Sequence, residues 1–142
     1  MLKLYTCVVC EKVILAQDST PSLINLFNKI ILAAPPGAEI PANAVAPKEW
    51  AVYASWDLEP GDELKQYSFC MVILFPDQTQ FGGIIRTKIA TAPNKRAQIA
   101  ASVLGFPIGQ KGFYTIRTWV EENQQMVSKP IEFKIELETK QP

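Results

Sequence analysis

Two cysteines stand at the spacing of a reactive pair. Cys7 and Cys10 form a Cys-x-x-Cys, which occurs in redox sites and as half of a zinc knuckle. Both uses need a turn or a helix start that brings the sulfurs together, but residues 2–9 are aromatic and β-branched, which predicts a strand. Residues three apart on a strand point to opposite faces. We therefore interpret both thiols, and Cys70, as small buried hydrophobic groups, with no disulfide between Cys7 and Cys10 and no bound transition metal.

The absence of histidine narrows the chemistry further. The 142 residues include none, so the usual Ser-His-Asp and Cys-His pairs and every zinc site that uses imidazole are excluded. The three cysteines alone leave a four-ligand zinc site one ligand short.

The carboxylates at expected turns are the remaining candidates for acid–base or calcium chemistry, namely Asp57, Asp62, Glu63 and Asp77. They form no Asp-x-Asp arrangement of the kind that binds calcium, and no two of them stand at a defined separation that would suit acid–base catalysis. Turn chemistry already accounts for Asp62 and Asp77. Gly82-Gly83 lacks the following helix, Lys and Ser/Thr of a phosphate-binding loop. We therefore predict no catalytic residue, no metal ligand and no cofactor.

Charge and hydropathy argue against two classes of partner. Fourteen basic residues balance fourteen acidic ones, so no overall field gathers nucleic acid or acidic lipid. A local basic group without interleaved aromatics is interpreted as a solvated face, and comprises Arg86, Lys88, Lys95 and Arg96. No segment reaches the roughly 18 uncharged apolar residues of a membrane span, and the N-terminal stretch lacks a signal-peptide pattern. We expect a cytoplasmic protein that binds neither nucleic acid nor membrane.

Period-two alternation of apolar residues predicts strands along most of the chain. Trp50–Leu58 has one wholly apolar face, and Gln66–Phe75 is apolar on both faces, as in a central covered strand. Gly82-Gly83 predicts a bulge, and Asn123 a turn. Near the C terminus the residues expected to face inward are Ile131, Phe133, Ile135 and Leu137.

Other segments give weaker patterns. Leu2–Val9, Val13–Ala16 and Ser22–Leu32 read as separate strand-like runs. Residues 33–48 contain four prolines, which lack amide donors and predict an irregular loop. Residues 96–104 suit a short helix or a strand, and the strands on both sides favour a strand.

Eight or nine short strands make an all-β, antiparallel β-sandwich the predicted fold, with a partly open β-barrel as the alternative. The whole chain, residues 1–142, is read as one domain. A chain of this length buries enough surface to fold without a metal or disulfide.

Two stretches carry a family resemblance. The first covers residues 10–30 and contains Cys-Glu-Lys-Val-Ile-Leu-Ala-Gln-Asp followed by Ser-Leu-Ile-Asn-Leu-Phe-Asn-Lys-Ile. The second covers residues 106–123 and contains Phe-Pro, then Gly-Phe-Tyr, a strand and a turn. The chain resembles an uncharacterised family of short bacterial proteins, a domain of unknown function. This resemblance implies a bacterial β-sandwich and brings no catalytic residue with it.

One set of side chains suggests an interaction surface. If Tyr114, Ile116 and Val120 face inward, the outer face of the same strand carries Phe113, Arg117 and Trp119. Aromatic residues beside an arginine on a rigid strand are typical of protein interfaces. The competing interpretation is that another segment covers this face.

The sequence alone leaves the function open among three classes. The leading hypothesis is a non-enzymatic protein-binding or structural domain that contacts another protein or a second copy of itself. The alternative is a small-ligand or carbohydrate-binding sandwich, for which a concave pocket with aromatic walls would speak. A carboxylate-dependent enzyme is the third.

Overall fold

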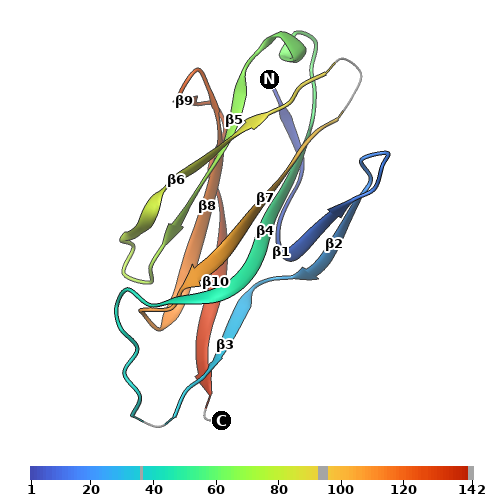
Figure 1. Cartoon of the computed structure of the whole chain (residues 1–142). Helices are drawn as coiled ribbons and strands as arrows, with labels where there is room; N and C mark the ends of the chain where they lie inside the picture. The colour runs from blue at the N-terminus through green and yellow to red at the C-terminus, as the bar shows by residue number, and fades with distance from the viewer. Residues whose placement is uncertain (36, 93–95, 141–142) are drawn as a thin grey trace.

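The structure is a computed structural model that describes residues 1–35, 37–92 and 96–140. These residues form ten strands in two sheets and one short 3-10 turn, η1 (Asp62–Leu64), as Figure 1 shows. The strands are β1 (Lys3–Leu15), β2 (Pro21–Leu26), β3 (Lys29–Ala33), β4 (Val45–Asp57), β5 (Tyr67–Leu74), β6 (Gln80–Ile89), β7 (Ala97–Pro107), β8 (Gly112–Glu122), β9 (Gln125–Met126) and β10 (Ile131–Lys140).

The two sheets give an all-β sandwich, as the sequence predicts. Sheet A has the order β2-β1-β4-β7, and sheet B has the order β3-β10-β8-β5-β6 with β9 beside β8. The described residues form ten strands, one more than the eight or nine expected from the sequence. One pair departs from the antiparallel rule, because β3 runs parallel to β10. The chain reaches β3, at the edge of sheet B, by crossing over from β2 in sheet A.

One hydrophobic core lies between the sheets. On β4, Trp50, Val52, Ala54 and Trp56 all point into it, as their alternation predicts. β5 is buried on both faces over most of its length, which confirms it as a central covered strand. On β10 the expected inward set is also confirmed: Ile135 and Leu137 are buried, and Ile131 and Phe133 are partly buried.

The N-terminal third differs from its expected division. Leu2–Val9 and Val13–Ala16 belong to one long strand, β1, which pairs first with β4 and then, from Cys10, with β2. Ser22–Leu32 is in turn two strands, because β2 belongs to sheet A and β3 to sheet B. The chain crosses between the sheets at Phe27, whose ring is buried in the core and whose N–H donates to the Val9 carbonyl at 2.9 Å.

The proline-rich segment is shorter than predicted. The expected loop 33–48 overlaps β3 at Ala33, and β4 begins at Val45, so Pro47 lies within a strand. The pairing of β4 with β7 shifts register between Ala46 and Glu49. A proline without an amide donor is accommodated at such an interruption of the ladder. Pro36 lies outside the described residues.

The second half of the chain follows its sequence pattern closely. Residues 96–104 fall almost entirely in β7, which confirms a strand rather than a helix. A register shift in the β5–β6 pairing lies beside Gly82-Gly83, and Gly82 has a φ of 64°, as expected of a bulge. Asn123 and Gln124 both take positive φ in the turn after β8. No helix among the described residues has the length and apolar character needed to cross a membrane.

Candidate functional site

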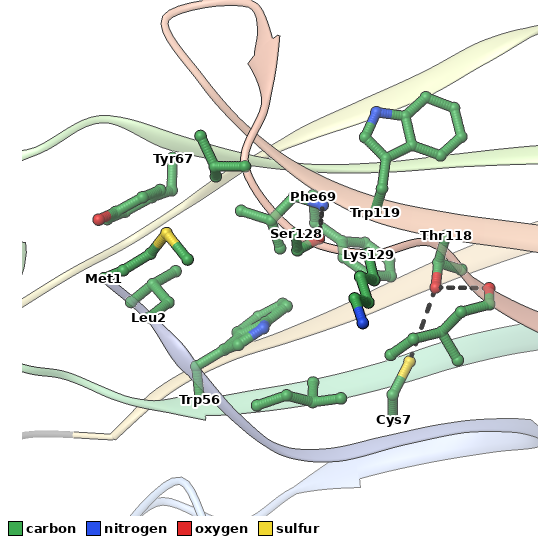
Figure 2. Close-up of a pocket in the computed structure, with 14 residues that line it drawn as sticks. Met1, Leu2, Cys7, Trp56, Tyr67, Phe69, Thr118, Trp119, Ser128 and Lys129 are labelled. Carbon is green, nitrogen blue, oxygen red and sulfur yellow. Dashed lines mark hydrogen bonds between the residues drawn. The ribbon is translucent and has the colours of Figure 1, made fainter.

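η1 and β9 lie at the same end of the sandwich (Figure 1). A cavity of about 240 Å³ opens between the two sheets near this end, and Figure 2 shows the side chains that line it. We call it the intersheet cavity. The residues that line it are Met1, Leu2, Leu4, Cys7, Trp56, Tyr67, Phe69, Thr118, Trp119, Val120, Val127, Ser128, Lys129 and Ile131.

Aromatic side chains from opposite sheets form its walls. Trp56 projects from β4 in sheet A, whereas Tyr67 and Phe69 project from the start of β5 in sheet B, as Figure 2 shows. The rings of Trp56 and Phe69 meet edge to face, with centroids 5.6 Å apart. This arrangement follows from the period-two alternation of both strands, which directs these residues toward the same space.

Two local features leave the cavity open on one side. Between Lys3 and Val9, β1 pairs with β4 alone, because its pairing with β2 begins only at Cys10. On sheet B, the segment between β9 and β10 runs beside β8, held by hydrogen bonds from Val127 N–H to the Val120 carbonyl at 2.9 Å and from Val120 N–H to Ser128 Oγ at 2.8 Å. The free edge of β1 and this segment frame the cavity.

A tyrosine and a buried carboxylate fix the wall nearest η1. The Tyr67 hydroxyl donates to Asp62 Oδ1 at 2.8 Å, and the Glu59 N–H donates to Asp62 Oδ2 at 2.8 Å. Burial of Asp62 acts to raise its pKa, but the hydrogen bonds from Glu59 and Tyr67 outweigh this and hold the pKa below its ordinary value. Burial and the neighbouring carboxylate raise the pKa of Tyr67. Asp62 is therefore a structural group.

Cys7 contributes the thiol of the cavity. Its Sγ lies 4.0 Å from Thr118 Oγ1, and Thr118 in turn donates to the Ile131 carbonyl at 3.2 Å. Burial raises the pKa of Cys7 to about 11, with a small opposing effect of Thr118. A thiol with this pKa is protonated near neutral pH and is a poor nucleophile.

Cys7 and Cys10 lie on β1 as the sequence predicts, and all three cysteines are free. Cys7 faces the core, whereas Cys10 is fully buried, with its thiol directed to the Lys12 carbonyl at 3.6 Å. Cys70 lies across from Trp119 in the β5–β8 pairing. The three thiols therefore lie in separate surroundings.

Two of the other turn carboxylates, Asp57 and Asp77, have separate local partners. Asp57 accepts a hydrogen bond from Arg96 at 2.9 Å, and Asp77 accepts from the Thr79 N–H at 2.9 Å and from the Gln110 amide at 3.0 Å. The structure gathers no cluster of three or more Cys, Asp and Glu side chains within the described residues. Turn and strand-end geometry accounts for these acidic groups.

The predicted interface residues share the outer face of sheet B but differ in exposure. Phe113 is 57% exposed, and Arg117 is partly exposed with its guanidinium 3.4 Å from Glu132 Oε2. Trp119 is only 8% exposed, so the expectation that it is an accessible aromatic is wrong. Its indole packs with three apolar residues of β5, which are Cys70, Val72 and Leu74.

Polar contacts hold Trp119 in that position. Its indole N–H donates to Glu121 Oε2 at 2.9 Å, and Glu121 Oε1 lies 3.3 Å from Arg86 Nε. Figure 2 shows the indole directed away from the intersheet cavity. Trp119 therefore belongs to a second small core on the outer face of sheet B.

The two arginines of the basic group predicted from sequence form ion pairs with different acidic residues. Arg86 pairs with Glu121, and Arg96 pairs with Asp57 and stacks on the Tyr5 ring at 3.5 Å from its centroid. Lys88 is exposed on β6, and Lys95 lies outside the described residues. Acidic partners compensate both arginines, so a concentrated positive surface does not form from the described members.

A second hollow lies on the outer face of sheet A, beneath the β1–β2 hairpin. It measures about 740 Å³, and residues of four strands contribute to it, including Tyr5, Tyr53 and Gln98. The Tyr53 hydroxyl donates to Gln98 Oε1 at 2.8 Å, and Gln98 Nε2 donates to the Ser19 carbonyl at 2.9 Å. These side chains satisfy one another, so the groove presents fewer free donors to a sugar than its polar lining suggests.

The sequence predicts that Trp56 lies on an apolar face, but it does not predict the cavity that Trp56 helps to line. Ser128 and Lys129 were missed altogether. The sequence feature that could have pointed to them is the short polar stretch before Pro130 and the final strand. Such a stretch indicates a turn, but it does not show which part of the protein the turn covers.

No protein-family model matches the chain, and no curated protein matches it significantly.

Proposed function

We propose that this chain is a non-enzymatic ligand-binding domain that holds a small apolar molecule, or the apolar part of one, in the intersheet cavity. The observation that carries the proposal is the cavity itself, a concave space walled by Trp56, Tyr67 and Phe69 from two sheets. Binding sites for small molecules are predominantly apolar hollows with a few polar groups at defined places.

The packing of the surrounding core supports this reading. Protein interiors are close-packed, and an unfilled apolar space forfeits the contacts its walls would otherwise make. The intersheet cavity is held open by side chains that are themselves well ordered by packing and hydrogen bonds, since Phe69 contacts Trp56 and Tyr67 bonds to Asp62. A ligand that fills the space would recover the missing contacts.

The titratable groups around the cavity favour binding over catalysis. Cys7 is protonated near neutral pH, and Asp62 is an ionised structural acceptor. A carboxyl that acts as a general acid needs a raised pKa, whereas the resolved shifts of described carboxyl groups are all downward: Glu11, Asp18, Asp62, Asp77, Glu121 and Glu138.

The test is a titration of the isotope-labelled protein with 1-octanol, a neutral apolar probe, followed by amide NMR shifts. We expect changes concentrated at lining residues such as Phe69, Val120 and Ser128. Val127→Phe places a ring at the cavity and should abolish these shifts. Val45→Phe is the control, because Val45 is about half exposed and does not line the cavity. Shifts that spare the lining residues, or that persist in Val127→Phe, would contradict the proposal.

A protein contact on the outer face of sheet B is the second candidate function. The large exposed ring of Phe113 and the partly exposed Arg117, on the same face of β8, favour it. The partner on this face is either another protein or a second copy of the chain. We further propose that the domain acts in the bacterial cytoplasm. Its three free thiols and its resemblance to short bacterial proteins support this proposal.

A further inference from the structure

Among the described residues, the intersheet cavity is lined by a single lysine, the exposed Lys129. Figure 2 shows Lys129 extending from the segment between β9 and β10 across the cavity toward β4 and β1. Among the described residues Lys129 makes no ion pair, whereas the Met1 amino group at the same cavity lies 2.9 Å from Glu59 and 3.1 Å from Asp62. The fourteen described residues of the lining include no Asp or Glu.

Ser128 adds a hydrogen-bond donor beside that charge. Its Oγ accepts the Val120 N–H at 2.8 Å, which leaves the hydroxyl hydrogen free to donate. Thr118 differs, because its hydroxyl already donates to the Ile131 carbonyl at 3.2 Å. The polar groups available at the cavity therefore include two donors, the Lys129 ammonium and the Ser128 hydroxyl, next to apolar walls.

From this charge complementarity we infer that the ligand is an amphipathic anion, a medium-chain monocarboxylate whose carboxylate contacts Lys129 and Ser128 while its alkyl chain lies against Trp56 and Phe69. A carboxylate accepts from an ammonium and a hydroxyl in charge-assisted bonds. This inference rests on the proposed function, since it names the ligand class of the same cavity.

The size of the cavity, about 240 Å³, limits the ligand to a chain of medium length. A chain of about eight carbons fills such a space, and octanoate is the probe of that length. Each methylene withdrawn from water contributes about fourfold in affinity, so hexanoate should bind about 15-fold more weakly than octanoate.

The experiment is calorimetric titration of the whole chain with octanoate and with 1-octanol, on the parent protein and on Lys129→Met. We expect octanoate to bind the parent about tenfold more tightly than 1-octanol, and Lys129→Met to weaken octanoate about tenfold while leaving 1-octanol unchanged. Retained binding of 1-octanol shows that the variant cavity is intact. Lys12→Met, an exposed lysine outside the lining, is the matched control and should leave both affinities unchanged.

The outcomes separate the two proposals. If both ligands bind the parent equally and Lys129→Met binds octanoate as the parent does, the cavity is apolar without charge selection and this inference is overturned. If neither ligand binds the parent, the proposed function itself fails. Added salt provides a further check, because salt screens the attraction between exposed charges. The affinity for octanoate should therefore fall as ionic strength rises. An affinity that rises with ionic strength would count against the Lys129 contact.

Discussion

Trp56 of sheet A and Phe69 of sheet B meet edge to face, with ring centroids 5.6 Å apart and planes inclined at 61°. The contact joins the sheets beside the intersheet cavity, so the two rings both close the core and define the space next to it. Pairs of this geometry contribute about 0.5–1.5 kcal/mol beyond the area that they bury.

Phe69→Ala should lower the free energy of unfolding by about 3–5 kcal/mol, because it removes a buried ring and enlarges a space that is already unfilled. Urea denaturation at 25 °C measures the change. Phe113→Ala is the control, since that ring is 57% exposed and its removal should cost within about 0.5 kcal/mol. Equal losses in the two variants would show that Phe69 is not a core residue.

Trp119→Ala distinguishes a core position from an interface position. Because the indole is 8% exposed and packs on Val72 and Leu74, we expect a loss of about 3 kcal/mol in folding stability with no change in oligomeric state. Sedimentation velocity and thermal melting measure the two quantities. A variant that melts like the parent but dissociates would instead place Trp119 in a contact between chains.

Phe113→Ser tests the protein-contact candidate. The substitution should leave the melting temperature nearly unchanged, and if the outer face of sheet B binds a second copy it should weaken that association by about 2 kcal/mol. Arg117→Ser on the same strand should act in the same direction. Sedimentation equilibrium over a range of concentrations gives the association constant, and a parent protein that is monomeric throughout would remove self-association from this candidate.

Asp62 should make folding stability depend on pH in the acid range. Its pKa is lower in the folded chain than its ordinary value of 3.8, so the folded state binds protons less readily than the unfolded state. The stabilisation is then complete above the ordinary pKa and is lost as pH falls below it toward the folded value. Asp62→Asn should be less stable than the parent at pH 7, and the difference should shrink as pH falls through 3.8. Urea denaturation of both proteins between pH 2 and 7 measures the difference, and a constant gap would contradict the assignment.

The thiols should resist alkylation in the folded protein. Burial, the main cause for both, raises the pKa of Cys7 and of Cys70 to about 11, and Cys10 is fully buried. Iodoacetamide at pH 7.5 should therefore modify the native chain far more slowly than the same chain in urea, as followed by intact mass. Rapid modification of Cys7 in the native state would show an accessible thiolate.

The strands are predictable where one face is buried and alternation is regular. Ile135 and Leu137 illustrate this, because a single pattern fixes both their strand and their direction. The β1, β2 and β3 region is different: the change of sheet at Phe27 depends on where the distant β10 lies, and no local pattern reports it. Pro47 likewise misleads, since the register shift between its own strand, β4, and the distant β7 decides whether a proline fits there.

The site was less predictable than the fold, for the same physical reason. The side of β8 that carries Trp119 follows from period two, but its burial depends on apolar residues of β5 that the fold brings beside it. The intersheet cavity joins side chains from β1, β4, β5, β8 and the segment before β10. Its existence depends on the small space left between them, which composition and spacing do not encode locally.

The parallel pairing of β3 with β10 has a consequence for how the chain reaches its native state. Residues 29–33 are synthesised about a hundred residues before their backbone partners, residues 136–140. Until those partners arrive, the edge of β3 and the side chain of Ile30 lack their native cover. Pairings between distant segments close slowly, and unpaired edges are sites of aggregation. Sheet B is therefore completed only after residues 136–140 have been synthesised, and until then β3 is an edge without its partner strand.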